Sequence, residues 1–255
     1  MCESDQKRSV TMSGDGKDEA HDCCDWDPDK PITLEFWKKT WDWEGEEDFH
    51  VTEVEKNMKK HLDKMVAGRE KIKMFFPCCG KVVDMKWVYD QGHTVVGLDI
   101  AKKPLVDFFE EHKLEYTSSP IGSIEGNVYQ TKDGRIKLYE CDLYQFNSKL
   151  EGKFDAIYDR KSFCSLNKCD KEKYAGVIVE LMDQDCRYML ITDEFDMSVF
   201  KGPPHSIPEW LIHDLYGEKC NIQQIEYYDQ LTPDSWWSRT NLKHMYEKVH
   251  IITLK

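Results

Sequence analysis

The sequence lacks any hydrophobic run long enough to cross a bilayer, since no stretch comes near the roughly 20 consecutive apolar residues that a spanning helix needs. Its first residues also lack the apolar core, about 7–15 residues long, that characterises a secretory signal peptide. We therefore expect a cytoplasmic protein that is not inserted in a membrane.

Positive charge is scarce relative to negative charge. The 255 residues contain 35 Lys and Arg against 48 Asp and Glu, which gives a formal net charge of −13. Over most of its surface such a chain would repel the phosphates of nucleic acid and an anionic bilayer. The composition thus predicts a small-molecule partner and no nucleic-acid or membrane partner, and we expect a monomer.

The ten cysteines lack the spacing of a metal site or of a disulfide framework. Cys23-Cys24 and Cys78-Cys79 are adjacent pairs, and no C-x-x-C pair accompanies them. Cysteines scattered through a long acidic chain are more typical of reduced, packed thiols than of small secreted scaffolds. We expect no bound metal.

Aliphatic residues are few at the start of the chain. Residues 1–29 combine Asp and Glu with Ser and Gly, so this segment cannot bury enough surface to offset the entropy of ordering. We expect a disordered acidic leader over residues 1–29. Residues 30–255 have a length that suits one domain with a single core.

The first part of that domain, residues 34–66, has the pattern of two helices. Trp37 and Trp41 fall on one helix face, and Thr52 with Glu55 forms a capping box before a second apolar stripe. Because aromatic residues are concentrated here, we expect this helical segment to act as a lid over a ligand site.

Short apolar runs alternate with helical patterns through the rest of the domain. The expected strands are Ile72–Phe76, Thr94–Leu98, Ile136–Cys141, Phe154–Tyr158, Tyr188–Thr192, Ile222–Tyr228 and Val249–Leu254. This alternation predicts an α/β fold with a doubly wound, mostly parallel sheet of seven strands and helices on both faces. The last two strands are expected to be antiparallel, and Val128–Lys137 is expected to form a hairpin insertion.

The most informative segment is the turn Pro77-Cys78-Cys79-Gly80, which joins the first strand to a helix over residues 82–91. The next strand delivers Asp99 about twenty residues beyond the turn, which is the layout of a nucleotide-type site with an acid for ribose hydroxyls. The turn has a single glycine and so lacks the G-x-G-x-x-G fingerprint. An ordinary strand–turn–helix remains the alternative.

Four motifs carry a longer resemblance. Residues 75–87 read FFPCCGKVVDMKW, residues 92–100 read GHTVVGLDI, and residues 153–160 read KFDAIYDR, with Gly202-Pro203-Pro204 farther on. From about Leu34 to the C-terminus the chain resembles the thiopurine S-methyltransferase family, whose members use S-adenosylmethionine. The resemblance implies a class I methyltransferase fold and the methylation of aromatic or heterocyclic thiols.

The expected cofactor residues are those at the ends of the strands and in the aromatic lid. They are Trp37, Trp41, Cys78, Gly80, Asp99, Asp142, Leu143 and Arg160. The carboxyl ends of parallel strands meet at one rim, and aromatic faces attract the sulfonium of the cofactor. Asp142 departs from the small hydroxyl residue that the family often has at this place. The alternatives are turn and cap roles for the acids and core packing for the tryptophans.

Arg160 is the expected catalytic residue, because a fixed cation favours the thiolate form of an acceptor. The resemblance implies that Phe49, Phe195 and Pro203 line the acceptor site. The family's second arginine, from the C-terminal part, has no clear counterpart in this sequence, and Arg239 is the candidate to replace it. His50 and His205 are further candidates, as proton carriers or as structural histidines.

Other functions remain compatible with the same residues. A halide, thiocyanate or small-thiol methyltransferase would differ in the size of its acceptor pocket, which the sequence does not report. A nicotinamide-dependent oxidoreductase would also place an acid on a ribose, although the single-glycine turn disfavours a pyrophosphate. A protein that binds the cofactor without catalysis is the third alternative.

Overall fold

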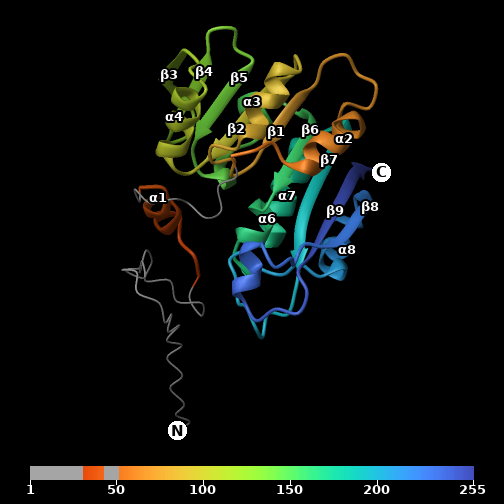
Figure 1. The fold of residues 1–255 in the computed structure, drawn as a ribbon. Helices are drawn as coiled ribbons and strands as arrows, with labels where there is room; N and C mark the ends of the chain where they lie inside the picture. Colours follow the sequence, from red (N-terminus) through yellow and green to blue (C-terminus); the bar gives the residue numbers. More distant parts are fainter. Residues whose placement is uncertain (1–30, 43–51) are drawn as a thin grey trace, which may run out of the picture.

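A computed structural model of the chain describes residues 31–42 and 52–255. The strands in these residues form one sheet in the order β3-β4-β5-β2-β1-β6-β7-β9-β8 (Figure 1). The predicted strands appear as β1 (Lys73–Phe76), β2 (Thr94–Asp99), β5 (Ile136–Glu140), β6 (Phe154–Arg160), β7 (Met182–Glu194), β8 (Cys220–Asp229) and β9 (Tyr246–Leu254). From β5 to β7 neighbouring strands are parallel, whereas β9 is antiparallel to both β7 and β8.

The expected number of strands was wrong, because the described sheet has nine strands and not seven. The two additional strands, β3 (Tyr116–Pro120) and β4 (Asn127–Thr131), extend the sheet beyond β5 as an antiparallel pair. The hairpin around Asp133-Gly134 is confirmed as the β4–β5 connection, with Gly134 at φ +68°. β3 escaped prediction because its side chains from Thr117 to Pro120 are exposed and show no apolar alternation.

Helices cover both faces of the sheet, as the doubly wound arrangement requires (Figure 1). Their bounds are α1 (Leu34–Asp42), α2 (Lys56–Val66), α3 (Val83–Asp90), α4 (Lys102–Glu111), α5 (Ser148–Glu151), α6 (Ser162–Ser165), α7 (Lys171–Leu181) and α8 (Glu209–Tyr216). Apolar side chains of α2, α3 and α4 pack in one core, and those of α6, α7 and α8 pack in the other. The central strands are buried on both sides, which explains their nearly continuous apolar sequences.

The start of α2 differs from the expected capping box. Glu55, and not Thr52, is the N-cap: its carboxylate accepts hydrogen bonds from the backbone N–H groups of Asn57 at 2.6 Å and Met58 at 3.3 Å. A glutamate at the cap satisfies the free N–H groups of the first turn and also complements the positive end of the helix dipole.

The expectations about membrane spans, cysteines and metal sites can be compared with the described residues. Within them, no helix is long and apolar enough to cross a membrane, the seven cysteines are all free, and no cluster of His, Cys, Asp and Glu is arranged to hold a metal. The leader predicted for residues 1–29, together with Phe49 and His50, lies outside the described residues.

Candidate functional site

Four neighbouring strands bring the predicted cofactor residues to one edge of the sheet. The order β5-β2-β1-β6 is parallel throughout, so the segments that follow these strands lie side by side at their carboxyl ends (Figure 1). Gly80, Asp99, Asp142 and Arg160 belong to these segments or end these strands. A crevice at this edge is where open α/β sheets bind their ligands.

Asp99 connects the turn after β1 to the end of β2. One carboxylate oxygen accepts the backbone N–H of Gly80 at 2.8 Å, and the other accepts the N–H of Ala101 at 3.0 Å. The residue is only 5% exposed, and this burial raises the pKa of its carboxyl although the two N–H groups act in the opposite direction. Each oxygen retains a second lone pair, so Asp99 can also accept hydroxyl donors such as those of a ribose.

The turn itself is packed closely against the side chain of Trp41. Cys78 and Gly80 both have left-handed backbones, with φ of +43° and +50°, and the N–H of Cys79 donates to the carbonyl of Leu98 at 2.8 Å. A Cβ placed on Gly80 would lie 2.6 Å from Cζ2 of Trp41, so only glycine leaves room for that indole. Because Trp41 is 6% exposed, α1 is packed directly against this turn.

The two tryptophans of α1 occupy different surroundings. Trp41 packs on the turn after β1, close to Gly80, whereas Trp37 is half-buried and packs edge-on against Phe36 with ring centroids 5.2 Å apart. The cofactor contacts of both tryptophans stay predictions.

Asp142 has a local structural role in addition to any ligand contact. It is the N-cap of the short 3₁₀ helix Leu143–Gln145, and its carboxylate accepts the N–H of Tyr144 at 2.9 Å. The neighbouring Leu143 is buried and contributes to the core. The capping alternative for this acid is thus present, and its predicted cofactor contact stays a prediction.

Asp159 and Arg160 are adjacent but face opposite sides of the sheet. Asp159 is fully buried among α6 and α7 and accepts hydrogen bonds from the hydroxyls of Tyr174 at 2.6 Å and Tyr188 at 3.0 Å. Arg160 shares the face of Tyr158, and its charge lowers the pKa of both Tyr158 and Asp84, against the stronger effect of burial. Among the described residues, the Arg160 guanidinium makes no hydrogen bond or ion pair, and its Nε is buried without a partner.

The predicted acceptor residues lie in the loop that follows β7. Phe195 packs against Phe200 and Trp237, with ring centroids 5.7 and 6.2 Å away. Phe195 and Asp196 also line an open pocket of about 380 Å³, but Arg160 is not among its lining residues. Their contact with an acceptor therefore stays a prediction, as does that of Pro203 in the same loop.

His205 fixes this loop to α6 and is a structural histidine. Its backbone N–H and its Nδ1 lie 2.7 and 3.0 Å from the carbonyl oxygen of Cys164, and burial lowers the pKa of the ring. Arg239 is exposed at the end of a 3₁₀ helix, Trp236–Arg239, between β8 and β9.

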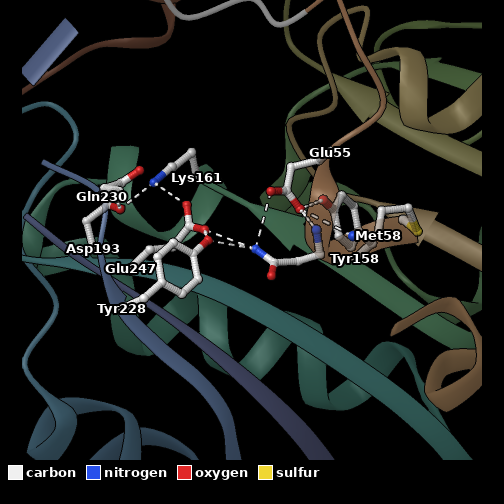
Figure 2. Close-up of polar contacts among 9 residues, drawn as sticks. Glu55, Met58, Tyr158, Lys161, Asp193, Tyr228, Gln230 and Glu247 are labelled. Atoms are coloured by element: carbon white, nitrogen blue, oxygen red, sulfur yellow. Dashed lines mark hydrogen bonds and ion pairs between the residues drawn. The ribbon is translucent and has the colours of Figure 1, made fainter. Parts of the chain in front are cut away.

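Sequence reasoning missed the buried polar residues beside Arg160. Asp84 accepts the backbone N–H of Glu55 at 3.1 Å, and burial raises the pKa of its carboxyl to about 6. Lys161 contacts Asp193 and Glu247, and Asn57 donates to Glu247 at 3.0 Å (Figure 2). The only signal in the sequence was an acid within the apolar run VVDMKW, because the other contacts join residues far apart in the chain.

Comparisons with known proteins agree with this architecture. The sequence model of the family described as thiopurine S-methyltransferase (TPMT) matches residues 32–255. A probable thiopurine S-methyltransferase from Danio rerio is 39% identical over 230 residues, which cover 89% of this chain and 97% of the relative. The thiopurine S-methyltransferase of Mus musculus is 35% identical over 227 residues, covering 88% and 92% of the two chains.

Solved structures share the fold at much lower identity. A SAM-dependent methyltransferase from Anabaena variabilis has a TM-score of 0.53 at 14% identity and covers 89% of this chain and 97% of its own. A didemethyltoxoflavin N1-methyltransferase from Burkholderia thailandensis, solved with S-adenosylhomocysteine, has a TM-score of 0.50 at 15% identity and covers 78% and 79%.

Proposed function

The chain belongs to the thiopurine S-methyltransferase family and is an S-adenosylmethionine-dependent methyltransferase, and we propose that its acceptors are aromatic or heterocyclic thiols. This membership sets aside the nicotinamide-dependent alternative. The excess of negative charge supports a small acceptor over a nucleic acid, and we further propose that the protein is a cytoplasmic monomer.

The residues at the carboxyl edge of the sheet fit this cofactor. Asp99 offers buried carboxylate lone pairs for ribose hydroxyls, and the left-handed turn at Cys78 and Gly80 brings backbone close to a ligand. Trp41 lies over that turn, where an aromatic face stabilises a sulfonium by roughly 0.5–2 kcal/mol. When bound, the cofactor supplies an electrophilic methyl group.

The observation that supports a thiol acceptor is that the Arg160 guanidinium has no ion-pair partner among the described residues. Its guanidinium is permanently charged near neutral pH, lies at the carboxyl end of β6 and makes no ion pair with another described residue. Such a cation lowers the pKa of a nearby thiol and holds its sulfur as the nucleophilic thiolate. Arg160 thereby replaces a general base.

Methyl transfer to a series of thiophenols of graded acidity tests this role. Arg160→Ala should lower kcat/KM most for weakly acidic thiols and least for iodide, which is always an anion, while the Kd of S-adenosylhomocysteine changes by less than about threefold. Arg135→Ala, in the distant hairpin, is the matched control and should behave as wild type. An equal loss for every acceptor, accompanied by an equal loss in cofactor affinity, would assign Arg160 to cofactor binding.

The same assay separates the remaining alternatives. Turnover with iodide or thiocyanate, and none with thiophenols or thiopurines, would identify a halide or thiocyanate methyltransferase. Binding of the cofactor without transfer to any acceptor of the panel would identify a non-catalytic binding protein.

A further inference from the structure

The residue that follows Arg160 has an unusual backbone for its type. Lys161 has φ of +70°, a left-handed conformation that glycine adopts readily and that side chains with a Cβ disfavour. Its carbonyl oxygen accepts both the N–H of Ser165 at 3.1 Å and the Ser165 hydroxyl at 2.8 Å, so it starts α6. Neither bond needs a lysine side chain, which suggests that the side chain is retained for its own contacts.

The Lys161 side chain lies between two buried carboxylates (Figure 2). Its Nζ forms an ion pair with Asp193, which is 0% exposed, and lies 3.5 Å from a carboxylate oxygen of Glu247, which is 4% exposed. Their other donors are neutral: Gln230 donates to Asp193, and Asn57 and Tyr228 donate to Glu247. Among residues 31–42 and 52–255, Lys161 is therefore the cation in direct contact with this pair.

Arg160 is placed to compete for the same carboxylates. In the parallel pairing of β6 with β7, Arg160 is opposite Ile191, and Asp193 lies two residues farther along β7 on the same face. A flexible arginine side chain can reach a neighbour at that diagonal position. No ion pair with a described residue holds the guanidinium elsewhere. If the charge of Lys161 were removed, Asp193 and Glu247 would be buried without a cation and would attract the Arg160 guanidinium away from the crevice.

We infer that Lys161 is a positioning residue for methyl transfer, because its contacts with Asp193 and Glu247 leave the Arg160 guanidinium available to an anionic acceptor. The inference rests on the proposed function of Arg160. The network also reaches the N-cap of α2, since Asn57 donates to Glu55 at 3.3 Å, and Tyr158 lies 3.5 Å from the same glutamate (Figure 2). Tyr158 and Lys161, which precede and follow Arg160 in the chain, thus belong to one set of contacts.

The test compares four variants in methyl transfer to the thiophenol series. Lys161→Met should lower kcat/KM by about tenfold or more, most for weakly acidic thiols, because the misplaced cation no longer supports the thiolate. Lys161→Arg, which keeps a cation, should retain most of the activity. Lys161→Met/Asp193→Asn/Glu247→Gln removes the competing charges together with the lysine, so its activity should recover to near wild type. Lys60→Met, which removes an exposed lysine paired with Glu226, is the matched control.

A merely structural lysine gives a different pattern. The triple variant would then be as poor as Lys161→Met, and the Kd of S-adenosylhomocysteine and the melting temperature would change in parallel with activity. That result, or wild-type turnover in Lys161→Met, overturns the inference. If Lys161→Met does not fold, the triple variant is compared with wild type: near-wild-type turnover supports the inference, and a tenfold or greater loss overturns it. Failure of wild-type protein to methylate any thiol would instead refute the proposed function, so the two failures are distinguishable.

Discussion

The contact of Asp99 with the cofactor ribose yields the sharpest prediction. Asp99→Ala removes a buried carboxylate that accepts two backbone N–H groups and, in our proposal, a ribose hydroxyl. Loss of the two backbone hydrogen bonds loosens the turn and costs about 1–3 kcal/mol of stability for each buried N–H group left without a partner. A simple loss of affinity would therefore not show which contact was responsible.

A comparison of two ligands isolates the ribose contact. Wild-type protein should bind S-adenosylhomocysteine more tightly than its 2′-deoxy analogue by roughly 1.5–3 kcal/mol, the range for a hydrogen bond to a charged group, or about 10- to 150-fold in Kd. Asp99→Ala should bind the two ligands about equally when measured by calorimetry. Asp133→Ala, which alters the hairpin turn, is the control and should discriminate as wild type does.

The preference of wild-type protein for S-adenosylhomocysteine over the 2′-deoxy analogue should decrease at low pH. Burial raises the pKa of Asp99, so acidification protonates this carboxyl sooner than an exposed aspartate, and the preference for the hydroxylated ligand should shrink as the pH falls. Equal discrimination by wild type and Asp99→Ala at neutral pH would refute the ribose contact and leave Asp99 as a residue that only shapes the turn.

Two further predictions concern the turn and the leader. Gly80→Ala should weaken S-adenosylhomocysteine binding by about tenfold or more, because its new Cβ has an unfavourable φ and would lie 2.6 Å from Trp41, whereas Gly92→Ala, with positive φ but open space, should lower only the melting temperature. Equal affinities of these two variants would contradict the close packing of Trp41 on the turn. Deletion of residues 1–29 should leave melting temperature and turnover nearly unchanged, and a large loss of either would show that the segment docks on the domain.

The sequence predicted the features that depend on neighbouring residues in the chain. Asp99 could be placed because a strand, a turn, a helix and a second strand follow one another within a short stretch, and parallel strands then bring their ends together. The hairpin at Asp133-Gly134 was predictable for the same reason, since its turn chemistry is local. The N-cap of α2 was not, because Thr52 and Glu55 have the spacing of a capping box, in which the threonine is the cap, and only the packed structure shows Glu55 in that position.

The polar network beside the crevice could not be predicted from local patterns. Lys161 directly follows β6, while Asp193 and Glu247 belong to β7 and β9, and the three meet only because the sheet order places those strands together. A lysine in a left-handed turn has no distinctive sequence signature either, since glycine or asparagine is the usual marker of that conformation. Contacts of this kind require the register of the strands, which composition and periodicity leave open.

The triplet Asp159-Arg160-Lys161 shows how register assigns function to adjacent charges. Asp159 faces the α7 side, where Tyr174 and Tyr188 satisfy its carboxylate, and it is therefore unable to neutralise the arginine beside it. Arg160 faces the other side, and on that side the lysine occupies the acids that the arginine would otherwise meet. A one-residue shift of β6 would exchange these faces and place the arginine among buried tyrosines. In our proposal, the availability of Arg160 to the acceptor therefore depends on the pairing of β6 with β7 as much as on the presence of an arginine in the sequence.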